Sequence, residues 1–462
     1  MDHKCIYCGA TTDLSESDII PDALTNARIF NKNVCRIAHN NRFSDLFESK
    51  VISELSFITN ELDIKSSKGK RYASYDATVT INGDAYDVSW DSDATLFGKR
   101  ILKSSDKTHI LGSYEKIVNI AKDEKLVEQI DVNQIELEKT VKINTAIFFD
   151  TAMFRMVAKI AYEWYCAKNQ VADFYPEFSS IVSYITEGSG TCPVSIIQSE
   201  EAYKTLSNEL NLGSHALFAF EAIDRKINVI VSLFGILIYR VIVADKKMPF
   251  CPNNFLFMEL CTDSSHKEIM HATIDEANAC FLEYLNPQNY IVGTTIAGMP
   301  VMVPRSFSQI SNAMRYPFIL NAIQCFGKVD NDTIVPNKHI VDILINQIQQ
   351  ITQASLLHKK SVKRFVREYF REGHDPIRLN PSMGNKKSII LFYTVFTIGK
   401  AEIAKLNDDI FQQIMRDSFR LSAGEELIVT DELESQLKNE ILKAENYPQI
   451  LEIGAKIINE WV

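Results

Sequence analysis

The sequence predicts an α+β protein with an N-terminal zinc-binding module of two strands and a helix, a central mixed α+β region, and a largely helical C-terminal domain. Three observations support this fold class. Closely spaced cysteines open the chain, alternating and continuous apolar runs fill its middle, and glycine and proline become sparse within the long stretches of its last third. These patterns are typical of a metal-stabilised module, of strands and of helix interiors, respectively. The predicted domains span residues 1–65, 66–330 and 331–462.

Paired metal ligands predict the first module. Cys5 and Cys8 are two residues apart and precede Gly9, a spacing at which a tight turn directs two thiolates toward one ion. Cys35 and His39 supply a second pair, so the four side chains complete a tetrahedral site for a structural zinc ion. The two strands and the helix of this module are expected at residues 14–21, 33–35 and 40–62.

The central region alternates strand and helix signals. Residues 72–90 alternate apolar and polar side chains around Asn82-Gly83, a dipeptide that favours the positive φ angles of a tight hairpin turn. A helix is expected over residues 143–168, which carry apolar side chains at helical spacing. The remaining strand-like segments lie at residues 129–141, 216–222, 229–243, 255–260 and 290–302.

One apolar run, residues 227–244, approaches the roughly 18–20 residues that cross a bilayer. Asn228, Gly235 and Arg240 interrupt it, and β-branched residues dominate it. Two buried strands therefore explain the run better than a membrane helix, and no membrane association is predicted.

The C-terminal domain is predicted to be helical, with a strand or buried helix at residues 386–398. Basic residues recur along one predicted helix at three- and four-residue steps, which is typical of a solvated helix face and also fits a local contact with nucleic-acid phosphates. These residues are Lys360, Lys363, Arg364, Arg367 and Arg371. Arg367 and His374 also resemble the Arg-His pair of HEPN ribonucleases, although His374 could instead stabilise the helix end. The expected helices span residues 307–326, 338–371, 401–420, 425–445 and 448–462.

Composition restricts the partners and the cell compartment that are expected for the protein. The 462 residues carry 49 basic and 59 acidic side chains, and this net charge of −10 excludes attraction of the whole molecule to polyanions. Any nucleic-acid contact must therefore be local. Nine cysteines, an odd count, indicate reduced thiols, and the start of the chain shows no signal peptide, so a cytoplasmic protein is expected.

The motif order of residues 5–60 resembles the zinc-bearing HNH endonuclease family, whose finger has the ββα-metal fold. In place of the family's usual Glu-His-Ile-Ile-Pro, this chain has Ser17-Asp18-Ile19-Ile20-Pro21. The usual closing Cys-x2-Cys-Asn appears as Cys35-x3-His39-Asn40. The resemblance implies a metal-dependent endonuclease that hydrolyses DNA phosphodiester bonds and a role in bacterial anti-phage defence. DNA is therefore the expected partner, and RNA is left open.

The resemblance also implies which residues carry the chemistry. Asp18 occupies the position of the catalytic histidine and Asn40 that of the helix asparagine, and both would bind a catalytic Mg or Mn ion; Asp45 could add a further oxygen. An aspartate is a poor general base at neutral pH but a good metal ligand. Two hypotheses follow: an active nuclease, or a catalytically degenerate zinc module that binds nucleic acid or a partner protein. If His39 is not a zinc ligand, it could serve as the missing base. A homo-oligomer is left open.

Overall fold

The computed structural model describes most of residues 3–304 with short gaps, together with residues 338–355, 377–379 and 427–429. The chain divides into two compact units. The first contains residues 1–60 and 64–344, and the second contains residues 61–63 and 345–462. The three-domain division expected from the sequence stays a prediction, whereas the mixed α+β character is confirmed.

The N-terminal module is an antiparallel hairpin followed by a helical segment. Strand β1 (Leu14–Asp18) pairs with β2 (Phe30–Cys35). Two π-type turns, Arg36–Asn41 and Ser44–Glu48, then lead into helix α1 (Ser49–Glu61). Both predicted strands and the predicted helix are therefore confirmed, although the helical segment begins at Arg36 rather than at residue 40. Its apolar side chains recur every three or four positions and are buried: Phe43, Phe47, Val51, Leu55 and Ile58.

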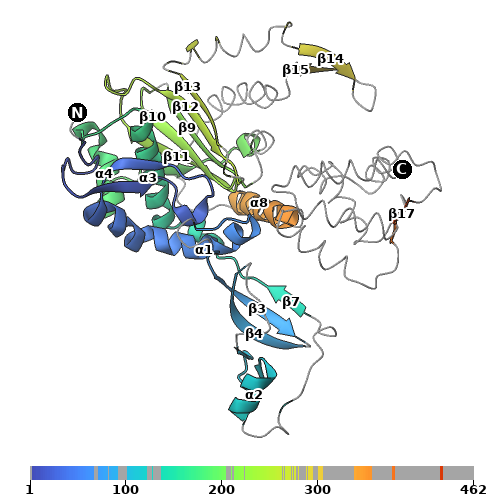
Figure 1. Ribbon diagram of the computed structural model, residues 1–462. Coiled ribbons are helices and arrows are strands. Elements are labelled where there is room, and N and C mark those ends of the chain that lie inside the picture. The colour runs from blue at the N-terminus through green and yellow to red at the C-terminus, as the bar shows by residue number, and fades with distance from the viewer. Residues whose placement is uncertain are drawn as a thin grey trace. The chain divides into compact units, whose positions relative to one another are not determined.

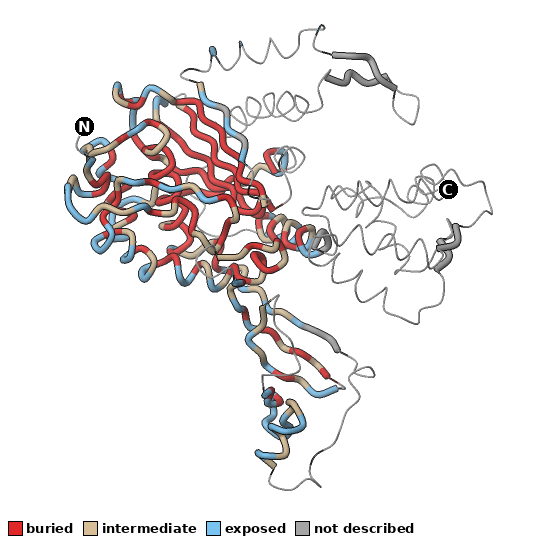
Figure 2. The backbone as a smooth tube through the Cα atoms, viewed as in Figure 1, coloured by how far each residue is buried: buried red, intermediate tan, exposed pale blue. Residues whose placement is uncertain are grey.

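Helix α3 (Thr151–Lys168) packs against both the N-terminal module and the large sheet (Figure 1). Asp150 caps its first turn by accepting a hydrogen bond from the amide of Ala152 at 2.8 Å. A 3-10 turn, Thr145–Phe149, precedes it, and helix α4 (Ser179–Glu187) packs against it. Because α3 has neighbours on both sides, its side chains are buried around nearly its whole circumference (Figure 2).

The large sheet has six antiparallel strands in the order β13-β12-β9-β10-β11-β8. The run 227–244 forms two of these strands, joined at Phe234 and Gly235 with positive φ angles of 57° and 68°. This confirms the prediction of two buried strands. In the part of the chain that the structure describes, no helix is long and apolar enough to cross a membrane. In the order of the sheet, the strands are His266–His271, Phe255–Leu260, His215–Glu221, Ile227–Leu233, Leu237–Ala244 and Val194–Ile196.

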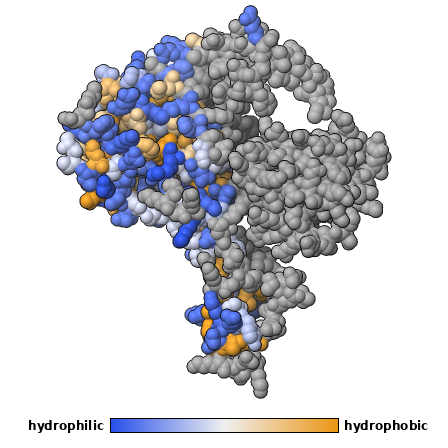
Figure 3. All heavy atoms as spheres, viewed as in Figure 1, coloured by the Kyte–Doolittle hydropathy of each residue, from blue (hydrophilic) through white to orange (hydrophobic). Residues whose placement is uncertain are grey.

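A smaller sheet contains the predicted hairpin of β3 (Tyr75–Ile81) and β4 (Asp84–Trp90). Gly83 lies in its turn with a φ angle of 94°, which a side chain would oppose. Helix α2 (Tyr114–Ala121) follows, and Figure 3 shows hydrophobic side chains at the surface of this part of the chain. Strand β7 (Leu137–Thr140) completes this sheet beside β3. Two separate pairs are formed by β5 (Leu102–Lys103) with β6 (Ile110–Leu111) and by β14 (Tyr290–Thr294) with β15 (Pro300–Pro304).

Helix α8 (Lys338–Ser355) confirms the first part of the helix predicted over residues 338–371. Strand β16 (Ile377–Leu379) pairs with β17 (Leu427–Val429), so the helix predicted from residue 425 is wrong over these three residues. Pairing with β16 stabilises these residues as a strand despite their helical sequence pattern, and the β-branched Ile428 and Val429 favour a strand. The predicted phosphate contacts at Lys360, Lys363, Arg364, Arg367 and Arg371, and His374, lie outside the described residues.

Candidate functional site

The structure brings the four predicted zinc ligands together at one end of the hairpin. Cys5 and Cys8 lie on a turn in which the amide of Gly9 donates to the oxygen of Cys5 at 2.8 Å. Cys35 ends strand β2, and His39 lies in the first π-type turn after it. All four ligand atoms lie within 4.8 Å of one another. Among the described residues, this is the one group of three or more such side chains arranged to hold a metal ion.

Two separations within the cluster match those of a tetrahedral zinc site. The Cys8 Sγ and Cys35 Sγ atoms are 3.7 Å apart, and Cys5 Sγ lies 3.5 Å from His39 Nδ1. Zinc bonds of about 2.3 Å to sulfur and about 2.0 Å to nitrogen would place two sulfurs about 3.8 Å apart and sulfur and nitrogen about 3.5 Å apart. The donor set and its spacing therefore fit zinc.

Without a cation, the cluster favours the protonated thiols. Burial and the neighbouring thiols of Cys5 and Cys8 raise the pKa of Cys35 to about 12, and burial raises the pKa of Cys5. Burial, followed by the charge of Arg42, lowers the pKa of His39 to about 4, so its imidazole is neutral and able to bind a metal. A bound zinc ion would supply the positive charge that keeps three clustered sulfurs as thiolates.

Aromatic packing sets the orientation of His39. Its ring stacks on Tyr7 with 5.0 Å between centroids and an interplanar angle of 25°, and Phe43 lies 5.7 Å from it. This packing directs Nδ1 toward Cys5, so the structure supports the role of metal ligand for His39 over that of general base.

An ion pair holds Asp18, the residue predicted to replace the catalytic histidine. The Nε and Nη2 atoms of Arg28 both donate to Asp18 Oδ1, at 2.9 and 2.7 Å. Arg28 also lies 3.6 Å from Asp22. The carboxylate expected to bind a catalytic metal is thus already neutralised by a cation from the same hairpin.

Asn40 joins the helical segment to strand β1. Its Nδ2 donates to the main-chain oxygen of Glu16 at 3.0 Å and to Ser15 Oγ at 3.3 Å. The structure therefore brings Asn40 to the strand that carries Asp18. Asp45 lies exposed in the second π-type turn and is not part of the metal-binding cluster.

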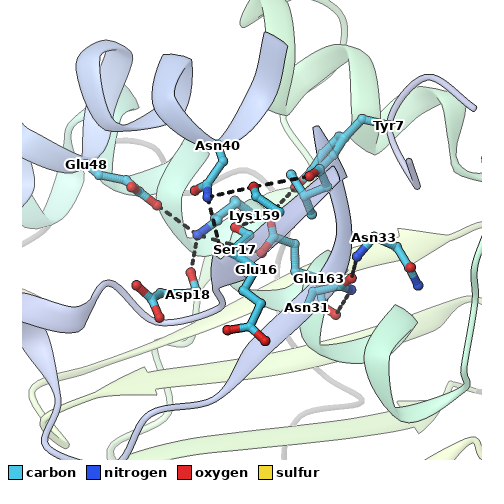
Figure 4. A network of polar contacts seen from close by, with 12 residues as sticks. Tyr7, Glu16, Ser17, Asp18, Asn31, Asn33, Asn40, Glu48, Lys159 and Glu163 are labelled. Atoms are coloured by element: carbon cyan, nitrogen blue, oxygen red, sulfur yellow. Dashed lines mark hydrogen bonds and ion pairs between the residues drawn. The ribbon is translucent and has the colours of Figure 1, made fainter. Parts of the chain in front are cut away.

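Behind β1 lies a buried polar cluster that the sequence patterns did not reveal (Figure 4). Lys159 on α3 lies 2.8 Å from Glu48 and 3.7 Å from Glu163, and it donates to the main-chain oxygen of Asp18. Glu163 accepts hydrogen bonds from Tyr7 at 2.9 Å and from Ser17 at 3.2 Å. The one sequence signal was the Lys-Glu pair four residues apart in a largely apolar helix.

The protonation of this cluster follows from burial and pairing. Burial would lower the pKa of Lys159, but the charges of Glu163 and Glu48 outweigh it and the pKa is raised. For Glu163, burial raises the pKa to about 7 against the opposing effects of Lys159 and of the hydrogen bonds from Ser17 and Tyr7. Lys159 is therefore charged at neutral pH, whereas burial makes it harder to ionise Glu163 than an exposed glutamate.

Hydrogen bonds to main-chain oxygens also join the N-terminal module to α3. Tyr162 donates to the oxygen of Ile6 at 2.6 Å, and Asn31 donates to the oxygen of Glu163 at 3.0 Å.

The comparisons with known proteins found no match among family models, curated proteins or solved structures. What the described residues show is a Cys3His cluster compatible with zinc, carried by a hairpin and helical segment that pack on α3.

Proposed function

We propose that this protein is a zinc-stabilised, HNH-type endonuclease that hydrolyses DNA phosphodiester bonds with Mg or Mn. One observation carries the proposal. The ligand atoms of Cys5, Cys8, Cys35 and His39 lie within 4.8 Å of one another on a hairpin that leads into a helical segment, and the same segment brings Asn40 against strand β1, which carries Asp18. An anti-phage role is an analogy with fingers of this type joined to larger domains.

The oxygen atoms of Asp18, Asn40 and Asp45 are the candidate ligands for the catalytic ion, because hard oxygen donors suit magnesium and manganese. Such an ion would supply an activated water and stabilise charge on the scissile phosphate. Since the hydrogen bonds of Asn40 use Nδ2, its Oδ1 could serve as a ligand. If Asp18 turned toward the metal, Arg28 would be released to pair with a phosphate oxygen.

The second candidate is a catalytically degenerate zinc module that binds nucleic acid or a partner protein. The ion pair between Arg28 and Asp18 favours it, because a carboxylate bound by a guanidinium through two hydrogen bonds is a weaker ligand for a further cation. The two candidates share the zinc site and differ only in whether the protein cleaves DNA.

The test is incubation of the purified chain with plasmid, linear duplex, single-stranded DNA and RNA in the presence of magnesium or manganese. We expect metal-dependent cutting of DNA that Asp18→Ala and Asn40→Ala each reduce by about a hundredfold or more. The control is Asp76→Ala, which removes an exposed carboxylate on β3 and should leave cutting unchanged. Cutting that survives both substitutions would place the active site elsewhere, and zinc without cutting would select the second candidate.

A further inference from the structure

Strand β1 presents its two faces to different surroundings. Ser17 points toward α3 and donates to Glu163, while the carboxylate of Asp18 points the other way and pairs with Arg28. The main-chain oxygen of Asp18, however, accepts a hydrogen bond from Lys159 on α3 (Figure 4). Asp18 is therefore held at two oxygens by two cations, a guanidinium from its own hairpin and an ammonium from a helix far along the chain.

The position of this ammonium is closely fixed. The side chain of Lys159 is 2% exposed, that of Glu48 is 10% exposed and that of Glu163 is fully buried. Three oxygens surround the ammonium: the main-chain oxygen of Asp18, which accepts its hydrogen bond, and one carboxylate oxygen each of Glu48 at 2.8 Å and Glu163 at 3.7 Å. Because an unpaired charge in such a place is strongly unfavourable, the ammonium is held among these three oxygens.

The helical segment that follows β2 also holds strand β1. Asn40 donates to the main-chain oxygen of Glu16, two residues before the oxygen that Lys159 binds. Glu48, which fixes Lys159, belongs to the same helical segment as Asn40. The helical segment thus acts on β1 twice, directly through Asn40 and indirectly through Glu48 and Lys159.

We infer that Lys159 and Glu48 are positioning residues for the strand that carries Asp18: the ammonium, held by Glu48, fixes the Asp18 main chain from the buried side so that its carboxylate lies on the opposite face of the strand, beside Arg28. This inference rests on the proposed function in so far as Asp18 binds a catalytic metal. Neither residue is expected to touch substrate or metal. Groups that orient a metal ligand typically alter metal affinity or activity by about 10–100-fold.

The test compares the full-length wild type with Lys159→Met and with the double variant Lys159→Met/Glu48→Met, which removes the ammonium together with its nearer carboxylate and leaves Glu163 with its hydrogen bonds from Tyr7 and Ser17. The matched control is Lys50→Met, because Lys50 pairs with Asp150 at 2.8 Å and so links the module to the start of α3 without contacting β1. Zinc content, the manganese concentration that gives half-maximal DNA cleavage, and amide hydrogen exchange over residues 14–18 are measured for each variant.

We expect the double variant to keep one equivalent of zinc, to need at least about tenfold more manganese, and to exchange the amides of residues 14–18 faster than the wild type does. Lys50→Met should match the wild type in all three. Wild-type exchange of these amides in the double variant would overturn the inference. If the wild type neither cuts DNA nor responds to manganese, the proposed function fails, and the exchange rates still decide whether Lys159 holds the strand.

Discussion

Buried His215, at the start of β9, makes the stability of this protein sensitive to acid. Its Nε2 donates to the main-chain oxygen of Leu24 at 2.8 Å, and its Nδ1 accepts from the amide of Phe234 at 3.3 Å. The neutral ring therefore satisfies both neighbours and connects the N-terminal module to the large sheet. A second ring proton would face the Phe234 amide and lose that hydrogen bond.

The size of the effect follows from the pKa. Burial lowers the pKa of His215 from 6.5 to about 4. Since the unfolded chain then binds more protons than the folded one, the stabilisation is complete above pH 6.5 and is lost as the pH falls toward 4. This shift of the pKa contributes about 3 kcal/mol to the free energy of unfolding, and about 2 kcal/mol of that contribution is lost at pH 5.

The assay is urea unfolding of the wild type and of His215→Gln at pH 7.5 and pH 5. Comparing the two chains isolates His215 from the other groups that titrate, including the zinc ligands. The free energy of unfolding of the wild type should fall by about 2 kcal/mol more than that of the variant. His109→Gln serves as the control, because that side chain is 60% exposed, and it should follow the wild type. An identical pH dependence for the wild type and His215→Gln would refute the reasoning.

Three further predictions follow from the site. Metal analysis of the native protein should return one equivalent of zinc, and Cys8→Ser should lose it and unfold the module, whereas Cys192→Ser, which alters a thiol outside the cluster, should keep it; a zinc-free native protein would contradict the site. Tyr162→Phe should lower the free energy of unfolding by about 1–3 kcal/mol, because it leaves the oxygen of Ile6 buried without its donor; an unchanged urea midpoint would show that another donor replaces it. Reversal of charge on the predicted basic stripe should weaken DNA or RNA binding and flatten its dependence on salt, and unchanged binding would make the stripe an ordinary surface. The substitutions for this last test are Lys363→Glu, Arg364→Glu and Arg367→Glu.

The zinc cluster could be predicted because its chemistry is local in the sequence. Cys5 and Cys8 form one short motif and Cys35 and His39 another, and soft ligands at such spacings have few other common uses. The strands were predictable for a similar reason, since the pattern of apolar residues follows from the faces that they bury. Phe234 and Gly235 divided the run 227–244 where the structure places its turn.

The polar cluster behind β1 could not be predicted, because its members are far apart in the chain. Lys159 and Glu163 are four residues apart, but Glu48, Tyr7 and Ser17 lie more than a hundred residues before them. A buried lysine in an amphipathic pattern looks like a solvent-exposed one until its partners are known. The ion pair of Asp18 with Arg28 was equally hidden, since nothing in a strand sequence fixes which cation a carboxylate will meet.

The packing of the N-terminal module on α3 has a consequence for its synthesis. The zinc ligands all lie within the first 39 residues, so the ion can bind soon after they leave the ribosome. Glu163, the acceptor for Tyr7, emerges 156 residues after its donor. At about 5–20 residues per second, the module would wait about 10–30 s for α3. A nascent chain would therefore carry a module that has bound its metal but lacks its contacts with α3. The strand that carries Asp18 would become fixed only after Lys159 and Glu163 have been synthesised.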